Sequence, residues 1–314
     1  MQPSQVEKVK MKTSQIMPGD FSVSVIAVPP LARHMDLGIN QYENTTLIQY
    51  LEANGISTFL YGGNANFYHL PMSEYRATLE FLAGATGNHS WVIPSAGPDY
   101  GRLQDQADIL RDFNFPTVMV LPQFQYITPL GVELALRKFA ERSRCPLLLY
   151  LKSEEYISPG VVGRLVEEGL VCGVKYAIER PDTKQDNYLR ELLECMDRRY
   201  VVSGMGERPA VIHMRDFQLS GFTSGAACIA PGMANQLLVA LKSQAYASAE
   251  KLRCAFLPLE DLRDLIGPVR VLHDAVTLSG IANMGPLLPM LSNLEPAHKS
   301  DVQAVVKQLI GAAK

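Results

Sequence analysis

The sequence has few cysteines and none of the spacings typical of metal sites. Its five cysteines stand singly, without a C-x-x-C pair, at Cys145, Cys172, Cys195, Cys228 and Cys254. An odd, unpatterned set favours a reducing cytoplasm over a disulfide framework or a zinc site. The six histidines form neither H-x-H nor H-E-x-x-H. We therefore expect a cytoplasmic protein without a metal site.

Long hydrophobic runs are also missing. No apolar stretch approaches the roughly 20 residues that cross a bilayer, and the polar start from Met1 to Lys8 lacks the apolar core of a secretory signal. A formal net charge of -3 gives no electrostatic case for nucleic acid or an anionic membrane surface. With 314 residues, 47% of them hydrophobic, the chain is long enough for one α/β barrel or two ordinary domains.

What the sequence does contain is a regular alternation of strand-like and helix-like segments, after a polar tail over residues 1–20. Eight short apolar segments predict strands, at residues 22–28, 58–61, 91–95, 117–121, 147–151, 171–175, 200–203 and 221–227. Helix-start signals lie between them, in Pro71-Met72-Ser73, Thr128-Pro129 and Ser158-Pro159. Eight strand–helix units within about 250 residues predict a closed (β/α)8 TIM barrel with a parallel sheet.

An open, doubly wound sheet is the alternative to a barrel. It would normally show G-x-G-x-x-G after its first strand, where this chain has Pro29-Pro30. We therefore expect the barrel to occupy residues 21–232. Residues 233–314 are expected to form a C-terminal helical extension packed on the barrel, because 245–265 and 299–310 show helical periodicity. Breaks are expected at Gly267-Pro268 and over residues 284–289.

A lysine in the sixth expected strand carries the strongest functional signal. Lys175 ends an apolar strand, where burial disfavours the ammonium form. An amine that is neutral near pH 7 can attack a ketone and form a Schiff base. A lysine at a strand end can equally extend its ammonium to water. The strand alone leaves both interpretations open.

Other polar or glycine-rich positions follow the expected strands, where the active sites of such barrels lie. Gly62-Gly63-Asn64 follows the second strand, and its backbone amides could hold a carboxylate or could simply form a tight turn. Tyr150 ends the fifth strand, either as a proton-transfer group or as a half-buried aromatic residue. Gly204 and Thr223 stand in glycine-rich turns that could bind phosphate or serve only the turns.

These strand-end residues resemble those of the dihydrodipicolinate synthase and N-acetylneuraminate lyase family of pyruvate-type class I aldolases. The similarity runs from about Phe21 to Ile310. Its specific part is Gly173-Val174-Lys175, which matches the family's G-[IV]-K Schiff-base lysine, together with Tyr150, which matches the tyrosine of its Y-N-x-P motif. The glycine loops support this match.

Three departures mark the chain as a divergent member rather than a true dihydrodipicolinate synthase. The two hydroxyl residues of the family's carboxylate loop fall on Gly63 and Asn64, so its Thr–Tyr–Tyr proton relay cannot exist in that form. The relay tyrosine lent by a neighbouring subunit falls near Phe124, where only Tyr126 could substitute. The arginine that grips the second substrate falls near Glu155, a carboxylate that would repel it.

The resemblance implies a Schiff-base-forming lyase that cleaves or forms a carbon–carbon bond in pyruvate or a related 2-keto acid. Lys175 would form the imine and Tyr150 would transfer protons. The substrate would be bound by Gly62, Gly63, Asn64, Gly204 and Thr223. The imine is the electron sink, so no cofactor is expected. The alternatives are a keto-deoxy sugar-acid dehydratase that uses the same imine, or a keto-acid-binding barrel without turnover. A homo-oligomer, tetramer or dimer, is also implied.

Overall fold

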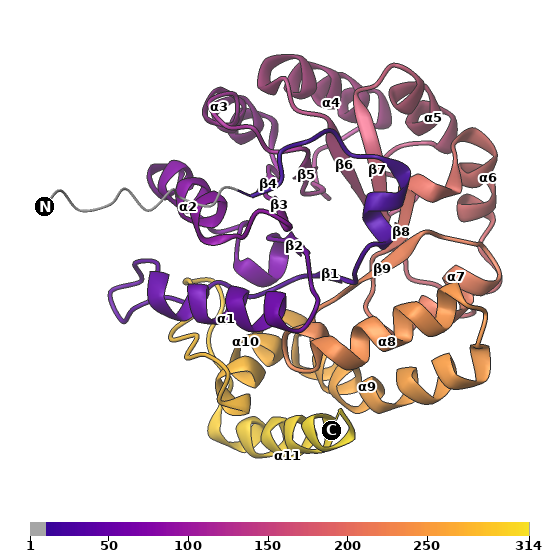
Figure 1. Ribbon diagram of the computed structural model, residues 1–314. Coiled ribbons are helices and arrows are strands. Elements are labelled where there is room, and N and C mark those ends of the chain that lie inside the picture. Colours follow the sequence, from indigo (N-terminus) through magenta and orange to yellow (C-terminus); the bar gives the residue numbers. More distant parts are fainter. Residues whose placement is uncertain (1–10, 314) are drawn as a thin grey trace, which may run out of the picture.

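The computed structural model describes residues 11–313. Short parallel strands form a barrel with the helices around it (Figure 1). The strands are β1 (Ile26–Ala27), β2 (Thr58–Leu60), β3 (Trp91–Ile93), β4 (Ser95–Ala96), β5 (Val118–Val120), β6 (Leu147–Leu151), β7 (Val171–Tyr176), β8 (Val201–Ser203) and β9 (Gly221–Ser224). The third expected strand is split into β3 and β4 at Pro94, because a proline has no N–H for the ladder.

The sheet closes on itself. Its strand order is β3-β2-β1-β9-β8-β7-β6-β5-β4, and every pair in it is parallel. Since β3 and β4 are consecutive pieces of one barrel strand, the two ends of this order meet. The (β/α)8 barrel predicted from the sequence is therefore confirmed.

The first strand is shorter than predicted. Strand β1 covers only Ile26–Ala27, and the preceding Pro18–Ser22 forms a 3-10 helix, η1. Proline at the first position of η1 and the Asp20 carboxylate, which accepts a hydrogen bond from the Met17 N–H at 2.7 Å, favour this turn over a strand. The turn places Phe21 against β7, where a Cβ on Gly173 would lie 2.7 Å from the Phe21 ring. Gly173 in the G-V-K motif therefore serves packing.

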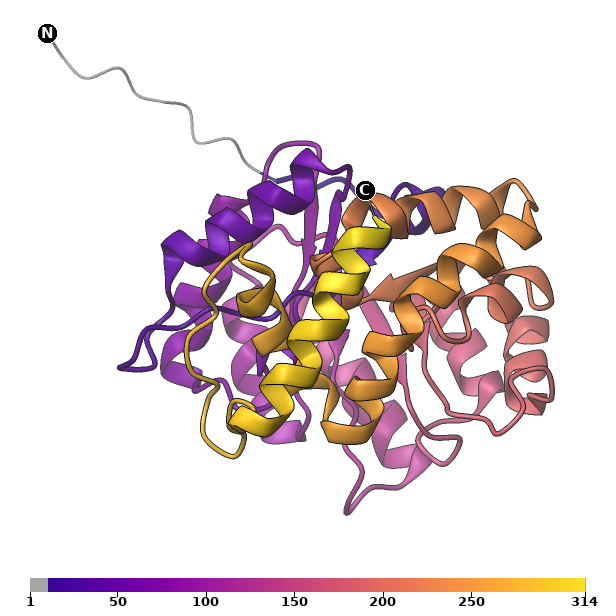
Figure 2. The same cartoon turned by 90° about the horizontal axis from the view of Figure 1, so that it is seen from below.

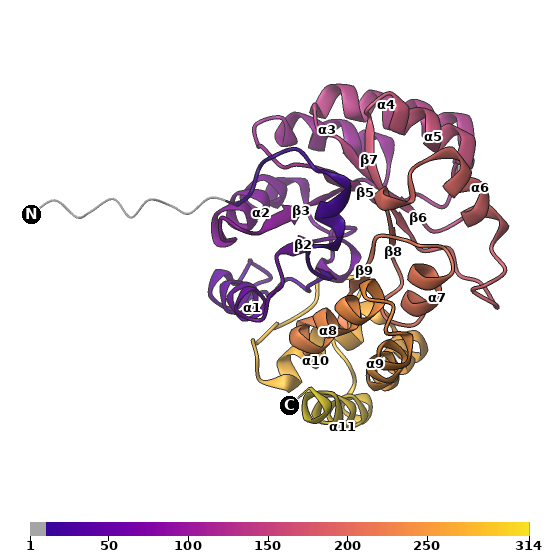
Figure 3. The ribbon, with the colours of Figure 1, turned by 45° about the vertical axis from the view of Figure 1, so that its right-hand side comes forward.

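Each barrel strand is followed by a helix on the outside of the barrel (Figure 3). These helices are α1 (Gln41–Ala53), α2 (Met72–Ala85), α3 (Tyr100–Leu110), α4 (Pro129–Ser143), α5 (Pro159–Glu167), α6 (Asn187–Cys195), α7 (Ala210–Arg215) and α8 (Pro231–Lys242). Thr128 caps α4, because its hydroxyl accepts a hydrogen bond from the Gly131 N–H at 3.1 Å. Ser158 precedes α5 without a side-chain cap, and α2 has Pro71 at its N-cap.

Three further helices form the C-terminal region, α9 (Tyr246–Ile266), α10 (Pro268–Ser279) and α11 (Pro296–Ala312). The predicted break at Gly267-Pro268 separates α9 from α10, with Gly267 at φ +137°. Helix α11 lies beside α9 at one side of the barrel (Figure 2). Position 232, our expected boundary, lies in the first turn of α8. No described helix combines the length and apolar composition that a membrane span requires.

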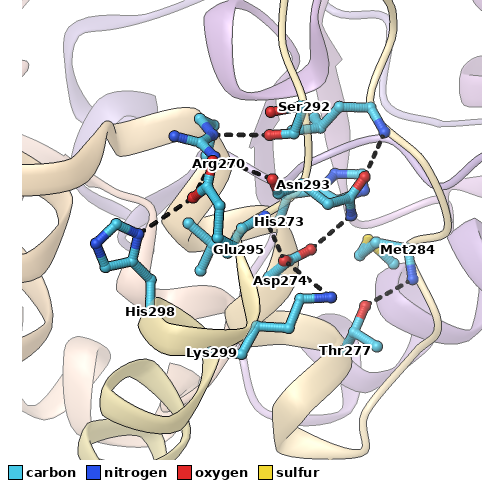
Figure 4. Close-up of polar contacts among 12 residues, drawn as sticks. Arg270, His273, Asp274, Thr277, Met284, Ser292, Asn293, Glu295, His298 and Lys299 are labelled. Atoms are coloured by element: carbon cyan, nitrogen blue, oxygen red, sulfur yellow. Dashed lines mark hydrogen bonds and ion pairs between the residues drawn. The ribbon is translucent and has the colours of Figure 1, made fainter.

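The segment between α10 and α11 is held by polar contacts with α10 (Figure 4). Asp274 accepts hydrogen bonds from the Asn293 side chain at 2.6 Å and from the Leu294 N–H at 2.8 Å. Arg270 donates to the Ser292 carbonyl at 2.8 Å. The same segment also reaches the barrel, because the Met284 carbonyl accepts a hydrogen bond from the N–H of Arg33 at 2.9 Å. These contacts fix its course over the barrel.

Candidate active site

A cavity of about 670 Å³ lies at the C-terminal ends of the barrel strands. It brings together six of the seven residues that the sequence singled out, namely Lys175, Tyr150, Gly63, Asn64, Gly204 and Thr223. Gly62 does not line it. A Cβ on Gly62 would lie 2.7 Å from the Met119 side chain, so packing requires the glycine there.

Lys175 is buried in the wall of this cavity. It lies on β7 directly beside Tyr150 on β6 and is 5% exposed. Burial lowers the pKa of its ammonium to about 7, and the nearby charges of Lys152 and Arg263 act in the same direction. No side chain within residues 11–313 forms an ion pair or hydrogen bond with it. A substantial fraction of the amine is therefore neutral and nucleophilic near pH 7.

The aromatic ring of Tyr150, rather than its hydroxyl, faces the lysine. The Lys175 Nζ atom lies 3.7 Å from the centre of that ring. Burial raises the pKa of the Tyr150 phenol above its ordinary value, and the proximity of Tyr68 raises it further. The hydroxyl of Tyr150 is therefore a proton donor that stays protonated at neutral pH.

Tyr68 is a second phenol in the cavity, and we did not single it out from the sequence. It follows the β2 loop and lies 3.7 Å from the position of a Cβ on Gly63. Burial raises the pKa of Tyr68 to about 12. Tyr126, the substitute expected from the sequence, is fully exposed and lines a different cleft, of about 560 Å³. Among the described residues that line the cavity of Lys175, Tyr68 is the second tyrosine besides Tyr150.

Glu155 does not line the cavity, so the repulsion expected from its carboxylate is not supported. It is exposed in the loop after β6. The residue that follows β6 into the cavity wall is the cation Lys152. In an irregular loop of this kind, the sequence pattern does not reveal which side chains point into the cavity and which point away from it.

The loop after β2 offers backbone amides to the cavity. It forms a 3-10 turn, η2 (Gly63–Ala65), closed by Asn66 at φ 60°. No described carbonyl accepts the N–H groups of Gly63 and Asn64, which start this turn. The Asn64 side-chain amide instead donates to the Val28 carbonyl at 3.0 Å. These two backbone N–H groups are therefore free to donate, and successive free N–H groups are a typical geometry for binding an anion.

A buried ionic cluster beside the cavity was missed by the sequence analysis. Glu207 follows β8, while Glu260 and Arg263 lie on α9. The Arg263 Nη1 atom donates to Glu260 Oε1 at 2.6 Å, and the Ser224 hydroxyl donates to Glu207. Burial, with a smaller contribution from the charge of Glu260, raises the pKa of Glu207 to about 8. The cluster joins residues far apart in the chain, so no local motif announces it.

Three glycines leave room for these side chains. A Cβ on Gly204 would lie 2.8 Å from the Lys175 side chain. A Cβ on Gly206, which has φ +68°, would lie 2.6 Å from Glu260, and one on Gly225 would lie 3.1 Å from the Arg263 guanidinium. The glycine-rich turns after β8 and β9 therefore admit a lysine and an ion pair, which explains them without a phosphate.

Residues 11–313 contain no cluster of three or more His, Cys, Asp or Glu placed to hold a metal ion. All five cysteines are free. The chemistry available at the site is thus that of an amine, two phenols, buried carboxylates and backbone amides.

No family model matches the chain. A probable 5-dehydro-4-deoxyglucarate dehydratase 2 from Streptomyces avermitilis is 25% identical over 262 residues, which are 80% of this chain and 77% of that protein. The crystal structure of dihydrodipicolinate synthase from Oceanobacillus iheyensis superposes with a TM-score of 0.81 and 21% identity, over 93% of this chain and 98% of that one.

A prophage protein of the dihydrodipicolinic acid synthase family from E. coli K12, whose crystal structure is a complex with pyruvate, superposes with a TM-score of 0.77 and 18% identity, over 91% of this chain and 98% of that one. The chain thus shares its fold with proteins of the dihydrodipicolinate synthase family, and it is similar in sequence, at 25% identity, to a protein described as a sugar-acid dehydratase.

Proposed function

We propose that the protein is a lyase that acts on a 2-keto acid through a Schiff base with Lys175. The observation that carries this proposal is a buried lysine with a pKa of about 7, in the wall of a cavity at the C-terminal end of a parallel barrel, and without an ion-pair partner among residues 11–313. Burying a lysine without an anionic partner is costly. This cost is explained if the amine is the nucleophile, because burial keeps part of it neutral and therefore reactive.

The residues of the cavity can be assigned to each step. The Gly63 and Asn64 backbone amides would hold the carboxylate of the keto acid next to the amine. The Lys175 nitrogen adds to the C2 carbonyl, and the carbinolamine loses one water to give a protonated imine. Tyr150 would donate the proton that the leaving hydroxyl needs. No metal or organic cofactor is required, because the imine accepts the electrons.

Carbon–carbon cleavage then follows from the imine. The bond between C3 and C4 breaks, its electron pair forms an enamine, and the C4 hydroxyl loses its proton as C4 becomes an aldehyde. Protonation of the enamine at C3 and hydrolysis of the imine return pyruvate and the free amine. Tyr68 and Tyr150 are the phenols that can carry these protons.

Dehydration is a second candidate reaction, favoured by the similarity to a protein described as a sugar-acid dehydratase. From the same imine, a proton leaves C3 and a hydroxyl leaves C4 as water. The two reactions differ in their products. Incubation with keto-deoxy sugar acids, followed by mass spectrometry, separates an aldehyde plus pyruvate from a product lighter by one water.

The direct test of the imine is trapping with borohydride. Wild-type protein mixed with pyruvate and borohydride is expected to gain the mass of one reduced pyruvyl group, and Lys175→Ala is expected to gain none. Lys152→Ala is the matched control, because Lys152 is the other lysine that lines the cavity. Absence of the adduct in the wild type, or its persistence in Lys175→Ala, would rule out the proposal.

We extend the proposal to a homo-oligomer. Large hydrophobic side chains are exposed around the second cleft, beside α3 and α4, and include Tyr100, Phe124, Tyr126, Leu130 and Leu134. Exposed apolar patches of this kind mark association surfaces. Sedimentation analysis of wild type and of Leu130→Glu tests this, since the charge should lower the mass of the assembly.

A further inference from the structure

Arg263 reaches the cavity from outside the barrel. It lies on α9, in the C-terminal region, and its guanidinium passes over the end of β9, where Gly225 has no side chain to block it. Pro268, Val269 and Leu291, which belong to the same region, also line the cavity. Part of the cavity wall is therefore built by segments that follow the barrel in the chain.

Two of the three guanidinium nitrogens of Arg263 donate hydrogen bonds within the described residues, and the third does not. Its Nη1 atom donates to Glu260 at 2.6 Å, and its Nε atom donates to the Pro268 carbonyl at 3.4 Å. Within residues 11–313, no acceptor is bonded to Nη2. An arginine carries five N–H donors, so Arg263 can bind a further acceptor in the cavity without giving up Glu260.

Apart from the nucleophile Lys175, Arg263 is the most buried of the arginines and lysines that line the cavity. Its side chain is 9% exposed, whereas that of Arg180 is 19% exposed and pairs with Glu154 and Asp186, and that of Arg208 is 44% exposed and pairs with Asp261 and Asp264. Lys152 is exposed. A charge–charge contact is stronger in a buried site than in water, where it is screened. Arg263 is thus the position at which an anion would gain most.

The place of Arg263 relative to the imine fits a second anionic group. Arg263 lines the same cavity as Lys175 and Tyr150, and its charge acts on both of them. The carboxylate next to the ketone is already served by the amides of Gly63 and Asn64. The cavity of about 670 Å³ is in the size range of ligands much larger than pyruvate, so there is room for a longer keto acid.

We infer that Arg263 is a specificity-determining residue that binds a second carboxylate, at the far end of the 2-keto acid from the carboxylate held by the β2 loop. The substrate class is then a 2-keto acid with a carboxylate at each end. Glu260 is the positioning residue, because it holds the guanidinium against the glycine turns after β8 and β9. This inference rests on the proposed function.

The test compares two six-carbon keto acids that differ only in the second carboxylate, 2-oxoadipate and 2-oxohexanoate. The concentration that gives half of the maximal borohydride-trapped adduct is measured for each. For the wild type we expect a value at least about tenfold lower for 2-oxoadipate, since hydrogen bonds to charged groups typically contribute that much. Arg263→Gln should bring the ratio close to one. Arg208→Gln, the matched control, should keep the wild-type ratio.

The readout is the half-saturating concentration of 2-oxohexanoate divided by that of 2-oxoadipate. Loss of Arg263 also changes the charge near Lys175, but this change affects imine formation with both keto acids alike and cancels in the ratio. Arg263→Lys keeps the charge beside Glu260 and loses the planar fork, so its ratio should fall between those of wild type and Arg263→Gln. If Arg263→Gln fails to fold, the inference is tested by whether the ratio of Arg263→Lys falls below that of the wild type. A wild-type ratio near one, or an unchanged ratio in the Arg263 variants, overturns the inference.

Failure of the proposed imine chemistry can be distinguished from failure of the Arg263 inference. If the wild type traps none of the three keto acids, pyruvate included, the imine proposal fails. The anion site is then tested without the imine, by the thermal shift that 2-oxoadipate and 2-oxohexanoate produce in Lys175→Met. A shift specific to 2-oxoadipate, lost on adding Arg263→Gln, supports the site, and equal shifts overturn it.

Discussion

The Nζ atom of Lys175 lies 3.7 Å from the centre of the Tyr150 ring, on the neighbouring strand of the barrel. The ring face is the negative part of an aromatic side chain, so it supports the ammonium form without a formal ion pair. The tyrosine thereby holds the amine with its ring and leaves its hydroxyl for proton transfer. The two parts of this side chain can be separated by substitution.

Tyr150→Phe should keep the lysine in place and lose the proton donor. We expect pyruvate adduct to form, while the exchange of its methyl hydrogens with solvent deuterium slows by about 10²–10⁴-fold, the usual contribution of general acid–base catalysis. Tyr150→Leu should impair both adduct formation and exchange. Deuterium exchange followed by NMR measures this, and equal exchange rates in wild type and Tyr150→Phe would contradict it.

The pH dependence of imine formation should follow the amine of Lys175, whose pKa is about 7. The trapping rate should rise through that pH as the ammonium loses its proton. Lys152→Gln removes a positive charge that disfavours the ammonium, so the pKa of Lys175 should rise and the profile should move to higher pH. Trapping rates between pH 5.5 and 9 measure the shift. A profile that stays in place would show that the Lys152 charge does not reach the amine.

Lys175→Met should stabilise the protein while abolishing the adduct. The folded pKa of Lys175 lies below that of the unfolded chain, so its burial costs most below pH 7, and stability rises as pH increases from about 7 towards the unfolded value. A methionine removes that cost. We expect the melting temperature at pH 6 to rise by at least about 2 °C, with a smaller gain at pH 9. Lys307→Met, on an exposed residue of α11 outside the cavity, is the control and should change little.

Glu207 should make stability fall with rising pH. Its folded pKa of about 8 lies above the ordinary glutamate value, so its contribution is fully present below about pH 4.5 and is lost as pH rises through 8. The groups that face it are Glu260, Arg263, Ser224 and Cys228. Glu207→Gln imitates the protonated side chain and should flatten this dependence. Urea unfolding at pH 5.5, 7 and 8.5 measures it, and parallel curves for the two proteins would count against the assignment.

Gly206→Ala should destabilise the ion pair of α9. Its φ of +68° strains any L side chain, and the new Cβ would lie 2.6 Å from Glu260. We expect the free energy of unfolding to fall by about 1–3 kcal/mol. Gly84→Ala is the matched control, because that helical glycine in α2 has open space around it and alanine favours helix by about 1 kcal/mol. Equal stabilities of the two variants would disprove the close approach.

The sequence predicted the barrel and its central lysine because both depend on local patterns. Parallel strands are continuous apolar runs, and Lys175 is conspicuous inside one. The same logic failed at β1, where Pro18 and Asp20 favour a 3-10 turn over part of the expected strand. It also assigned the glycines after β8 and β9 to turns or a phosphate. Gly204 makes room for Lys175 on β7, and Gly206 and Gly225 make room for Glu260 and Arg263 on α9. These side chains are distant in the sequence, so no local pattern connects them with the glycines.

Tyr68, Glu207 and Arg263 were missed for related reasons. Tyr68 stands in a loop with several other polar and aromatic residues, and only the fold turns its side chain to the cavity. Glu207 and Arg263 look like ordinary surface charges in sequence, because charged residues are mostly exposed. Their burial follows from packing of α9 against the barrel end, which depends on contacts between distant segments.

The segment after α10 forms part of the cavity wall, although it is synthesised after all of the barrel strands. The last barrel strand ends at Ser224, whereas Leu291 lines the cavity from a segment that is held in part by contacts with Asp274 and Arg270. A nascent chain that has completed its barrel therefore carries a reactive lysine without its outer wall. The complete cavity around Lys175 therefore exists only after residues that follow the barrel in the chain have folded onto it.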